Sequence, residues 1–292
     1  MTYRKNNSPE LIKNELRFLQ VLSKTGYVPK VEGYGVDYID MELLSIDGRC
    51  IDEVEFARNA ARALKTLRVN KIVHGDLTYR NIIIRNDIPI VIDFAESRFS
   101  YENNVKDKRC EGDYYHFWRA ISRFSPDTTR RLRRWICIRD NLVGQSIIDL
   151  GCFEGDFCGF AHSEGMNASG IDKDIFAIHR ALDIWPGVAF SIGDITTSLY
   201  LNASNILLMD VFPYIVNQYG WEIASDLMFK CVNLSDALFF ETQLFGDGPG
   251  PREFLNDSDV EKYLIQFGKK VESILTLTVP GRETFRTLWK IS

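Results

Sequence analysis

The sequence has few of the residues that mark secreted or metal-binding proteins. Its 292 residues include six cysteines and four histidines, with no Cys-x-x-Cys pair and no metal-like spacing between cysteine and histidine. It also has no apolar run as long as a membrane span, and its polar start, MTYRKNNSPE, is unlike a signal peptide. We therefore expect a cytoplasmic protein with reduced, mostly buried thiols at Cys50, Cys110, Cys137, Cys152, Cys158 and Cys231.

Positive charge is scarce in one half of the chain only. Residues 1–143 contain 25 Lys and Arg against 20 Asp and Glu, whereas residues 144–292 contain 10 against 20. The net charge thus changes from +5 to −10, which favours two separate domains. The basic half suits an anionic ligand, and the acidic half argues against nucleic acid as a partner. A drift of surface charge without functional meaning is the alternative.

Residues 145–210 alternate short apolar strands with helical patterns, which predicts a mostly parallel α/β sheet. The segment QSIIDLGCFEG begins as a buried strand and turns on glycines into a helix over 156–165. Further strands are expected at 168–172, 188–192 and 204–209, with helices at 174–184 and 220–232. Open sheets of this kind bind ligands at the carboxyl ends of their strands. Four acids are expected at that edge: Asp149, Asp172, Asp194 and Asp210.

Asp172 follows Asp149 by 23 positions, the spacing at which a nucleotide-binding unit places a carboxylate on the ribose hydroxyls. A nicotinamide-binding domain is the alternative, but it would want a third glycine that DLGCFEG does not supply. The ordered set resembles the class I S-adenosylmethionine-dependent methyltransferases over residues 144–292.

This resemblance implies S-adenosylmethionine as the cofactor. Asp149, Gly151 and Gly155 would line its methionine part, Asp172 would hold the ribose and Asp194 the adenine amino group. Asp210 would lie beside the cofactor, where the family places residues of the acceptor side. Phe153 departs from the first motif, which usually has glycine there. The motif after Asp210 is not that of amino-group methyltransferases, so an oxygen acceptor is favoured.

The end of the chain predicts the completion of the sheet. A fifth strand is expected at 237–242, and β-rich segments at 271–279 and 283–291 flank Pro280-Gly281, a turn signal. An antiparallel hairpin here matches the usual ending of the methyltransferase family. The segment 246–251, GDGPGP, cannot be helix or strand. It is either a plain connection or a loop over the acceptor site.

A second motif lies in the basic half, VHGDLTYRNIII followed by IVIDFA. Two strands at 82–84 and 88–92 would place Asp76, Asn81 and Asp93 at the ends of one small hairpin. Phosphoryl transfer needs a carboxylate to orient the attacking hydroxyl and oxygen ligands for magnesium, which this set supplies. A chance loop is the alternative.

The motif resembles the core of the protein-kinase-like superfamily, and HGDL is nearest to aminoglycoside phosphotransferases, lipopolysaccharide kinases and the small kinase of the tRNA-modifying KEOPS complex. The resemblance implies ATP and magnesium as cofactors. Ala95 replaces the glycine usual after Phe94. The resemblance implies that Asp76 is the catalytic base and that Asn81 and Asp93 are magnesium ligands. Asp113 would brace the catalytic loop. Lys5 and Glu15 would form the lysine–glutamate pair at ATP.

Only four residues precede Lys5, so we expect a kinase-like domain over residues 1–140 that is truncated and lacks a glycine-rich loop. Its α+β fold would be followed by the Rossmann-like domain of residues 144–292. This pairing resembles the bifunctional enzymes that terminate bacterial O-antigen polysaccharides. It implies phosphorylation, O-methylation or both on a saccharide or a related hydroxyl- or phosphate-bearing acceptor.

Two alternatives stay open. The kinase-like half could be a non-catalytic module that binds a partner or the acceptor. The basic segment Arg130–Arg139 could be a solvated helix face, or a contact to a phosphorylated acceptor or to the inner face of an anionic membrane. The sequence names neither the methyl acceptor nor the oligomeric state.

Overall fold

The computed structural model describes residues 2–44, 52–100, 113, 116–118, 120–121, 130–197, 203–278 and 285–292. The chain divides into two compact units, one made of residues 1–132 with 163–165 and the other of residues 133–162 with 166–292. The fold class is mixed α/β, as the sequence predicts. The assignment of one activity to residues 1–140 and another to residues 144–292 stays a prediction.

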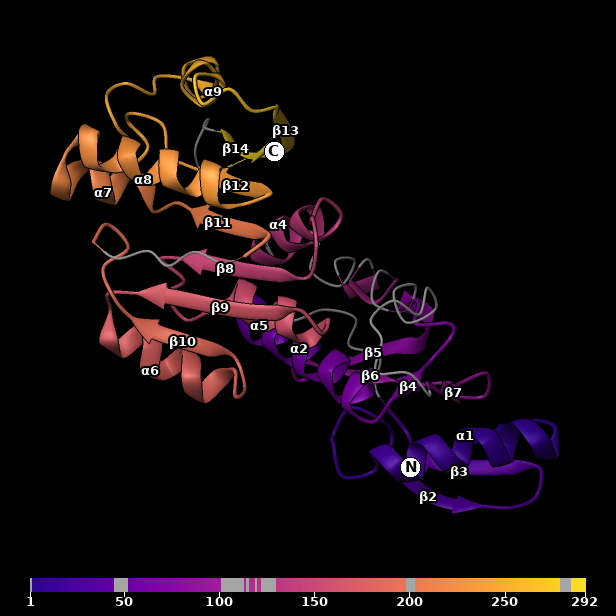
Figure 1. Ribbon diagram of the computed structural model, residues 1–292. Helices are drawn as coiled ribbons and strands as arrows, with labels where there is room; N and C mark the ends of the chain where they lie inside the picture. The colour runs from indigo at the N-terminus through magenta and orange to yellow at the C-terminus, as the bar shows by residue number, and fades with distance from the viewer. Residues whose placement is uncertain are drawn as a thin grey trace. The chain divides into compact units, whose positions relative to one another are not determined.

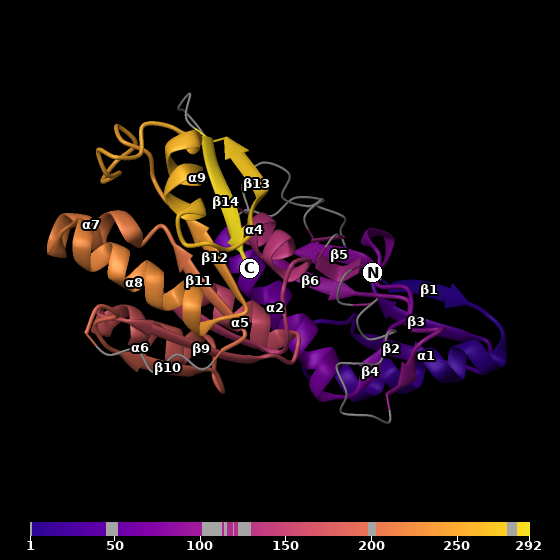
Figure 2. The same cartoon turned by 45° about the horizontal axis from the view of Figure 1, so that its top comes forward.

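The first unit opens with a three-stranded antiparallel sheet in the order β1-β3-β2. Helix α1 (Pro9–Leu22) lies beside this sheet, as Figures 1 and 2 show. The helix begins where it does because Ser8 caps it through Leu11 and Pro9 occupies its first turn. The strands are β1 (Thr2–Asn6), β2 (Val31–Tyr34) and β3 (Tyr38–Glu42).

The rest of the first unit carries the HGDL motif. Helix α2 (Glu53–Val69) buries an apolar stripe that includes Phe56, Ala60 and Leu64. The predicted hairpin is confirmed, and its turn residues Asn86 and Asp87 both have positive φ, as a tight hairpin turn requires. The remaining elements are β4 (Ile72–Val73), η1 (Tyr79–Asn81), β5 (Ile82–Arg85), β6 (Ile88–Val91) and β7 (Arg98–Phe99), with β4 paired to β7.

The second unit is built on a seven-stranded sheet in the order β10-β9-β8-β11-β12-β14-β13. The first five strands in this order run parallel, and β14 pairs antiparallel with both β12 and β13. This arrangement confirms the predicted sheet and its closing hairpin. In Figure 1 the arrows of β10, β9, β8 and β11 point the same way. The strands are β8 (Ser146–Leu150), β9 (Asn167–Asp172), β10 (Ala189–Ile192), β11 (Asn205–Met209), β12 (Ala237–Glu241), β13 (Val271–Thr278) and β14 (Phe285–Ile291).

The central strands are nearly continuous runs of buried apolar residues because helices cover a parallel sheet on both faces. One large cluster joins β8, β11 and β12 to the side chains of α7, α8 and α9. Phe212, Trp221 and Tyr263 form its aromatic centre. In Figure 2, α9 lies beside β13 and β14. The helices are α4 (Arg130–Arg139), α5 (Asp156–Ser163), α6 (Ile175–Ile184), α7 (Phe212–Tyr219), α8 (Trp221–Leu234) and α9 (Asp257–Ile265).

Several expectations about single features can be compared with this fold. The segment 246–251 is neither helix nor strand, as predicted, whereas the turn expected at Pro280-Gly281 lies outside the described residues. Four cysteines that the structure describes have free thiols, and three of them are buried. Cys50 and Cys110 lie outside the described residues. In the part of the chain that the structure describes, no helix is both long and apolar enough to cross a membrane.

Candidate functional sites

Three ionisable side chains from distant parts of the first unit meet at one point. The Nζ of Lys5, on β1, lies 2.8 Å from Oε2 of Glu15 on α1 and 2.7 Å from Oδ1 of Asp93, which follows β6. Glu15 is only 1% exposed, and this burial raises the pKa of its carboxyl group, although the Lys5 ammonium opposes the shift. The arrangement leaves Oδ2 of Asp93 without a hydrogen bond from any described residue.

The backbone around Asp93 is held firmly. Asp93 has a φ of +64°, a left-handed conformation that is uncommon outside glycine. Phe94 is buried, and its ring lies 4.8 Å from that of His74 and 6.3 Å from that of Phe18. Asn14 Nδ2, on α1, donates to the carbonyl oxygens of Ala95 and Ser97 at 2.8 Å each. The segment is therefore fixed by packing and hydrogen bonds, with alanine in the place of the usual glycine.

The HGDL loop is braced from inside the unit. The buried carboxylate of Asp113 accepts hydrogen bonds from the backbone N–H groups of His74 at 2.5 Å and Gly75 at 2.9 Å. Burial raises the pKa of Asp113 to about 6, although the two amides lower it. The contact is the brace that the sequence resemblance implies for Asp113.

Asp76 and Asn81 lie at one end of the loop. Asn81 Nδ2 donates to the carbonyl oxygen of Asp76 at 2.8 Å and to its Oδ2 at 2.9 Å, and no described residue bonds the Oδ1 of Asn81. The His74 ring accepts from the Asp76 N–H through Nδ1 and lies 2.9 Å from the Ile92 carbonyl oxygen through Nε2. Burial lowers the pKa of His74, which favours the neutral ring that this pair of bonds requires.

These residues do not form a complete metal site by themselves, but they offer some of the oxygen ligands that a magnesium–nucleotide needs. No cluster of three or more His, Cys, Asp or Glu ligands occurs among the described residues. Magnesium, however, usually takes one or two protein oxygens and completes its shell with water and substrate phosphates. Asn81 Oδ1 and Asp93 Oδ2 are two such oxygens.

In the second unit, two glycines allow a close approach of backbone at the end of β8. Gly151 has a φ of +80°, and a Cβ there would lie 2.4 Å from Val211 Cγ2. Gly155 has a φ of +73°, and a Cβ there would lie 2.3 Å from Phe190 Cζ. Both positions therefore require glycine for two independent reasons, conformation and space.

Asp172 lies at the end of β9 and fixes the glycine turn. Its Oδ2 accepts from the Phe153 N–H and its Oδ1 from the Asp174 N–H, both at 2.8 Å. Phe153 itself adopts a φ of +50° with an exposed side chain, and Arg180 lies 5.7 Å from its ring. The turn thus keeps the left-handed conformation in the position where the resembled family has glycine.

Asp149 and Asp194 differ in their surroundings. Asp149 is 3% exposed, and burial, with the nearby charges of Asp172 and Asp156, raises its pKa to about 8. Asp194 follows β10 and is half-buried. Burial acts to raise the pKa of Asp194, but hydrogen bonds from Thr196 and Tyr219 outweigh it and lower the pKa. Of these two carboxyl groups, the one on Asp194 is therefore the more readily ionised.

Asp210, at the end of β11, belongs to a network of charges that sequence reasoning missed. Arg286 Nη1 donates to Asp210 Oδ2 at 2.6 Å, and Arg286 Nε lies 3.4 Å from Asp247 Oδ2. Arg134 forms a two-pronged pair with the fully buried Glu241 and lies 3.9 Å from Asp210. Burial and the charge of Glu241 raise the pKa of Asp210 to about 6, against the two arginines. Nothing local in the sequence joins these partners, which are 76 and 107 positions apart.

Arg134 also settles part of the question about the basic segment Arg130–Arg139. Its guanidinium points into the second unit and is 9% exposed, and Trp135 is buried against Phe160. The burial of Trp135 and Leu132 agrees with the alternative of a solvated helix whose apolar residues pack inward, whereas the burial of Arg134 was not expected. Whether its other arginines contact an acceptor or a membrane stays a prediction.

Comparisons with known proteins agree with a kinase-like first unit. The model of the RIO domain family matches residues 2–108. A probable bifunctional tRNA threonylcarbamoyladenosine biosynthesis protein of Methanosphaera stadtmanae is 27% identical over 132 residues, 42% of this chain and 24% of that protein. The chain spans a quarter or less of the length of the curated relatives it matches. The matching family model is that of the RIO domain, whereas the motif resembles aminoglycoside phosphotransferases, lipopolysaccharide kinases and the small kinase of the KEOPS complex.

Solved structures similar to the chain include a bifunctional kinase-methyltransferase and single methyltransferases. The bifunctional kinase-methyltransferase WbdD aligns over 55% of this chain and 39% of its own, with 16% identity and a TM-score of 0.47. A TehB-like S-adenosylmethionine-dependent methyltransferase from Corynebacterium glutamicum aligns over 64% of this chain and 99% of its own, with 18% identity and a TM-score of 0.44.

Proposed function

We propose that the chain is a bifunctional transferase that binds S-adenosylmethionine in its second unit and a magnesium–nucleotide in its first. The observation that carries the first half of this proposal is the geometry at the ends of β8 and β9. There, two obligate glycines and the carboxylate of Asp172 form a backbone-lined turn at the ligand-binding edge of a parallel sheet.

S-adenosylmethionine would supply a methyl group on a positively charged sulfur. The chain's own contribution is positioning, since in-line displacement gains much of its rate from the orientation of the two reacting atoms. Asp172 would bind the ribose hydroxyls, Asp194 the adenine amino group, and the Gly151 turn the methionine part. Asp149, which is buried at the same strand end, would lie near the amino-acid end of the cofactor.

The first unit would orient a nucleotide for phosphoryl transfer. The Lys5 ammonium, held by Glu15, would bind phosphate oxygens, and Asp93 with Asn81 would hold magnesium. Asp76 would orient the acceptor hydroxyl and receive its proton. We propose a saccharide or a related hydroxyl- or phosphate-bearing molecule as the acceptor, on the strength of the pairing of the two units.

The proposal is tested by incubating candidate glycans with S-adenosylmethionine, with magnesium and ATP, and with both, and weighing the products by mass spectrometry. We expect a methylated product that requires S-adenosylmethionine and a phosphorylated product that requires ATP. Methylation that is unaffected by Asp76→Ala and by Asp93→Ala, together with no phosphorylated product, would leave a methyltransferase with a non-catalytic kinase-like module.

A further inference from the structure

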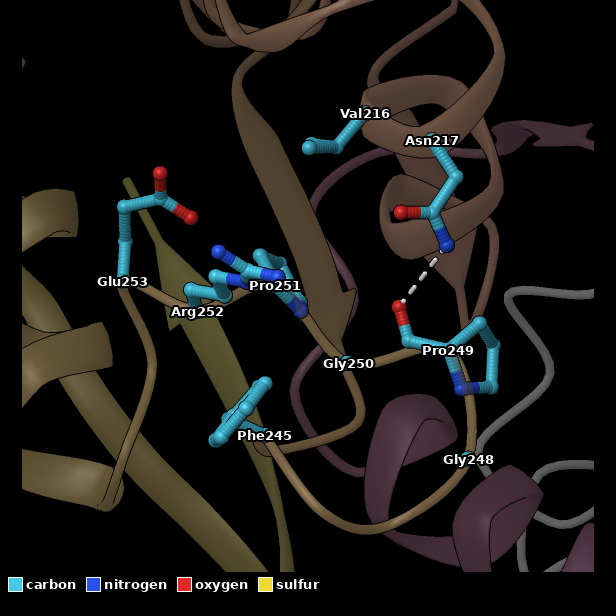
Figure 3. A pocket seen from close by; sticks show the side chains of 9 residues that line it. All are labelled: Val216, Asn217, Phe245, Gly248, Pro249, Gly250, Pro251, Arg252 and Glu253. Atoms are coloured by element: carbon cyan, nitrogen blue, oxygen red, sulfur yellow. Dashed lines mark hydrogen bonds between the residues drawn. The ribbon is translucent and has the colours of Figure 1, made fainter.

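A hollow of about 350 Å³ lies between α7 and the loop that follows β12 in the second unit. Figure 3 shows Val216 and Asn217 reaching from α7, and Phe245, Arg252 and Glu253 on the loop. The glycines and prolines of the segment 248–251 complete the lining. This volume lies at the small end of the range for ligand pockets in proteins, about 300–1,000 Å³, and suits one or two rings.

The loop is anchored rather than loose. Asp247 is 2% exposed, donates its N–H to the Leu244 carbonyl oxygen at 3.0 Å and pairs with Arg286. Phe254 is 1% exposed and packs on the aromatic cluster of α7 and α8. Asn217 Nδ2 donates to the Pro249 carbonyl oxygen at 3.1 Å, the bond drawn in Figure 3. A pocket wall that is already ordered loses little entropy on binding.

The glycines show that the loop is closely packed. A Cβ on Gly250 would lie 2.0 Å from the Leu244 carbonyl oxygen, and one on Gly248 would lie 2.5 Å from Gln243 Oε1. Close packing therefore requires glycine at positions 248 and 250, whereas Gly246 has open space around it and a positive φ.

Three side chains of the hollow have no partner in the described part of the chain. Phe245 is 51% exposed, and Arg252 and Glu253 are exposed as well and make no hydrogen bond or ion pair with any described residue. Arg252 has donors only, and an ionised Glu253 has acceptors only. A simple anion would be attracted by Arg252 but repelled by Glu253. A simple cation would be attracted by Glu253 but repelled by Arg252. A hydroxyl group both donates and accepts, so a ring with several hydroxyls satisfies the two residues together.

We propose that this hollow binds a small polyhydroxylated ring, such as a neutral sugar, as a subsite for the methyl acceptor. The apolar face of the ring would lie on Phe245, and its hydroxyl groups would bond Arg252, Glu253 and Asn217. Arg286 links the subsite to the strand edge, because it contacts both Asp247 of the loop and Asp210 at the end of β11. The inference rests on the proposed methyl transfer and adds the place and chemistry of acceptor binding.

The test is ligand-observed NMR on the full chain. The probes are the methyl glycosides of glucose, mannose, galactose and rhamnose, compared with an anionic glucose phosphate and with cationic glucosamine. We expect at least one neutral glycoside to bind more tightly than both charged sugars. Phe245→Ala, Arg252→Ala and Glu253→Ala should each weaken that binding about tenfold, the loss expected for one charged hydrogen bond or one aromatic contact.

Leu255→Ala and Glu261→Ala are the matched controls, since both side chains are exposed and neither lines the hollow. They should leave glycoside binding unchanged. The inference is overturned if no neutral glycoside binds at tens of millimolar, if the glucose phosphate binds most tightly, or if the three lining variants bind like the controls. Calorimetry with S-adenosylmethionine separates the two proposals: loss of the subsite leaves cofactor affinity intact, whereas a wild-type chain that binds no cofactor refutes the methyltransferase proposal itself.

Discussion

The ammonium of Lys5 lies 2.8 Å from the carboxylate of Glu15, although the two belong to different elements and Glu15 is almost fully buried. Lys5 also contacts Asp93, which comes 88 positions later. A buried carboxylate is costly unless it is paired, so this contact is both a stabilising feature of the first unit and the basis of its proposed nucleotide site.

Lys5→Met should therefore lower both stability and nucleotide affinity. Because Lys5 is partly exposed, we expect a loss of about 1–3 kcal/mol in the free energy of unfolding, less than for a fully buried pair. The measurements are urea unfolding and titration with magnesium and ATP. Lys13→Met, on the exposed side of α1, is the control and should change neither quantity. If both variants bind ATP as the wild type does, Lys5 has no role at the phosphates.

Variants at Asp76 and Asp93 should distinguish phosphoryl transfer from nucleotide binding in the first unit. Asp93→Ala removes a proposed magnesium ligand and should abolish binding of magnesium–ATP. Asp76→Ala should leave binding nearly intact and abolish transfer of a radiolabelled phosphate to a saccharide acceptor, since Asp76 would act on the hydroxyl alone. The idea fails if wild-type protein shows no ATP binding at millimolar concentration. Equal nucleotide affinities for wild type and Asp93→Ala would also remove Asp93 from the site.

The pair between Arg134 and Glu241 should dominate the local stability of the second unit. Both side chains are buried, so Arg134→Met leaves an unpaired carboxylate and should cost about 3–5 kcal/mol in the free energy of unfolding. The double variant Arg134→Met with Glu241→Leu should recover most of this loss, because it removes both charges of the pair and leaves no unpaired carboxylate at position 241. Chemical denaturation of the three proteins measures the effect. A double variant as unstable as the single one would mean that the pair itself, not the orphaned charge, sets the cost.

Asp149 should make stability depend on pH. Its folded pKa of about 8 lies above the value of an unfolded Asp, so its contribution to stability is fully present at low pH and is lost as the pH rises towards 8. Asp149→Asn cannot ionise. The free energy of unfolding of this variant, measured relative to that of the wild type, should therefore rise by about 2–5 kcal/mol between pH 4 and pH 8.

The check is urea unfolding of the wild type, Asp149→Asn and the exposed control Asp183→Asn across that pH range. The control should follow the wild type throughout. A difference between Asp149→Asn and the wild type that does not change with pH would show that Asp149 is ionised when folded.

Periodicity and turn residues were enough to predict most of the elements that carry the proposed sites. The sheet from β8 to β14 follows from apolar runs separated by helical patterns, and the hairpin of β5 and β6 from two apolar strands around Asn86-Asp87. Each signal is local, because it depends on residues within one strand or turn. The same holds for the glycines at positions 151 and 155, whose backbone conformations the structure shows to be left-handed.

Other elements and contacts were not predicted from the sequence, because the patterns that would indicate them are weak or involve residues far apart in the chain. Strand β1 is made of TYRKN, whose side chains are mostly exposed, and it exists by pairing with β3. Helix α7 contains Pro213 near its start and follows Asp210, so it resembles a loop in sequence. The contacts of Arg286 with Asp210 and of Arg134 with Glu241 bring together residues far apart in the chain, which one sequence cannot reveal.

Calorimetric titration of S-adenosylmethionine into the wild type, Asp172→Ala and Asp183→Ala tests the central claim most directly. Asp172→Ala removes a charged partner of the ribose and the anchor of the Phe153 N–H, so affinity should fall by about 1.5–3 kcal/mol, roughly tenfold to more than a hundredfold. Asp183→Ala, an exposed residue of α6, should bind like the wild type. Equal affinities in all three proteins, or no binding to the wild type, would contradict the assignment of this strand edge as the cofactor site.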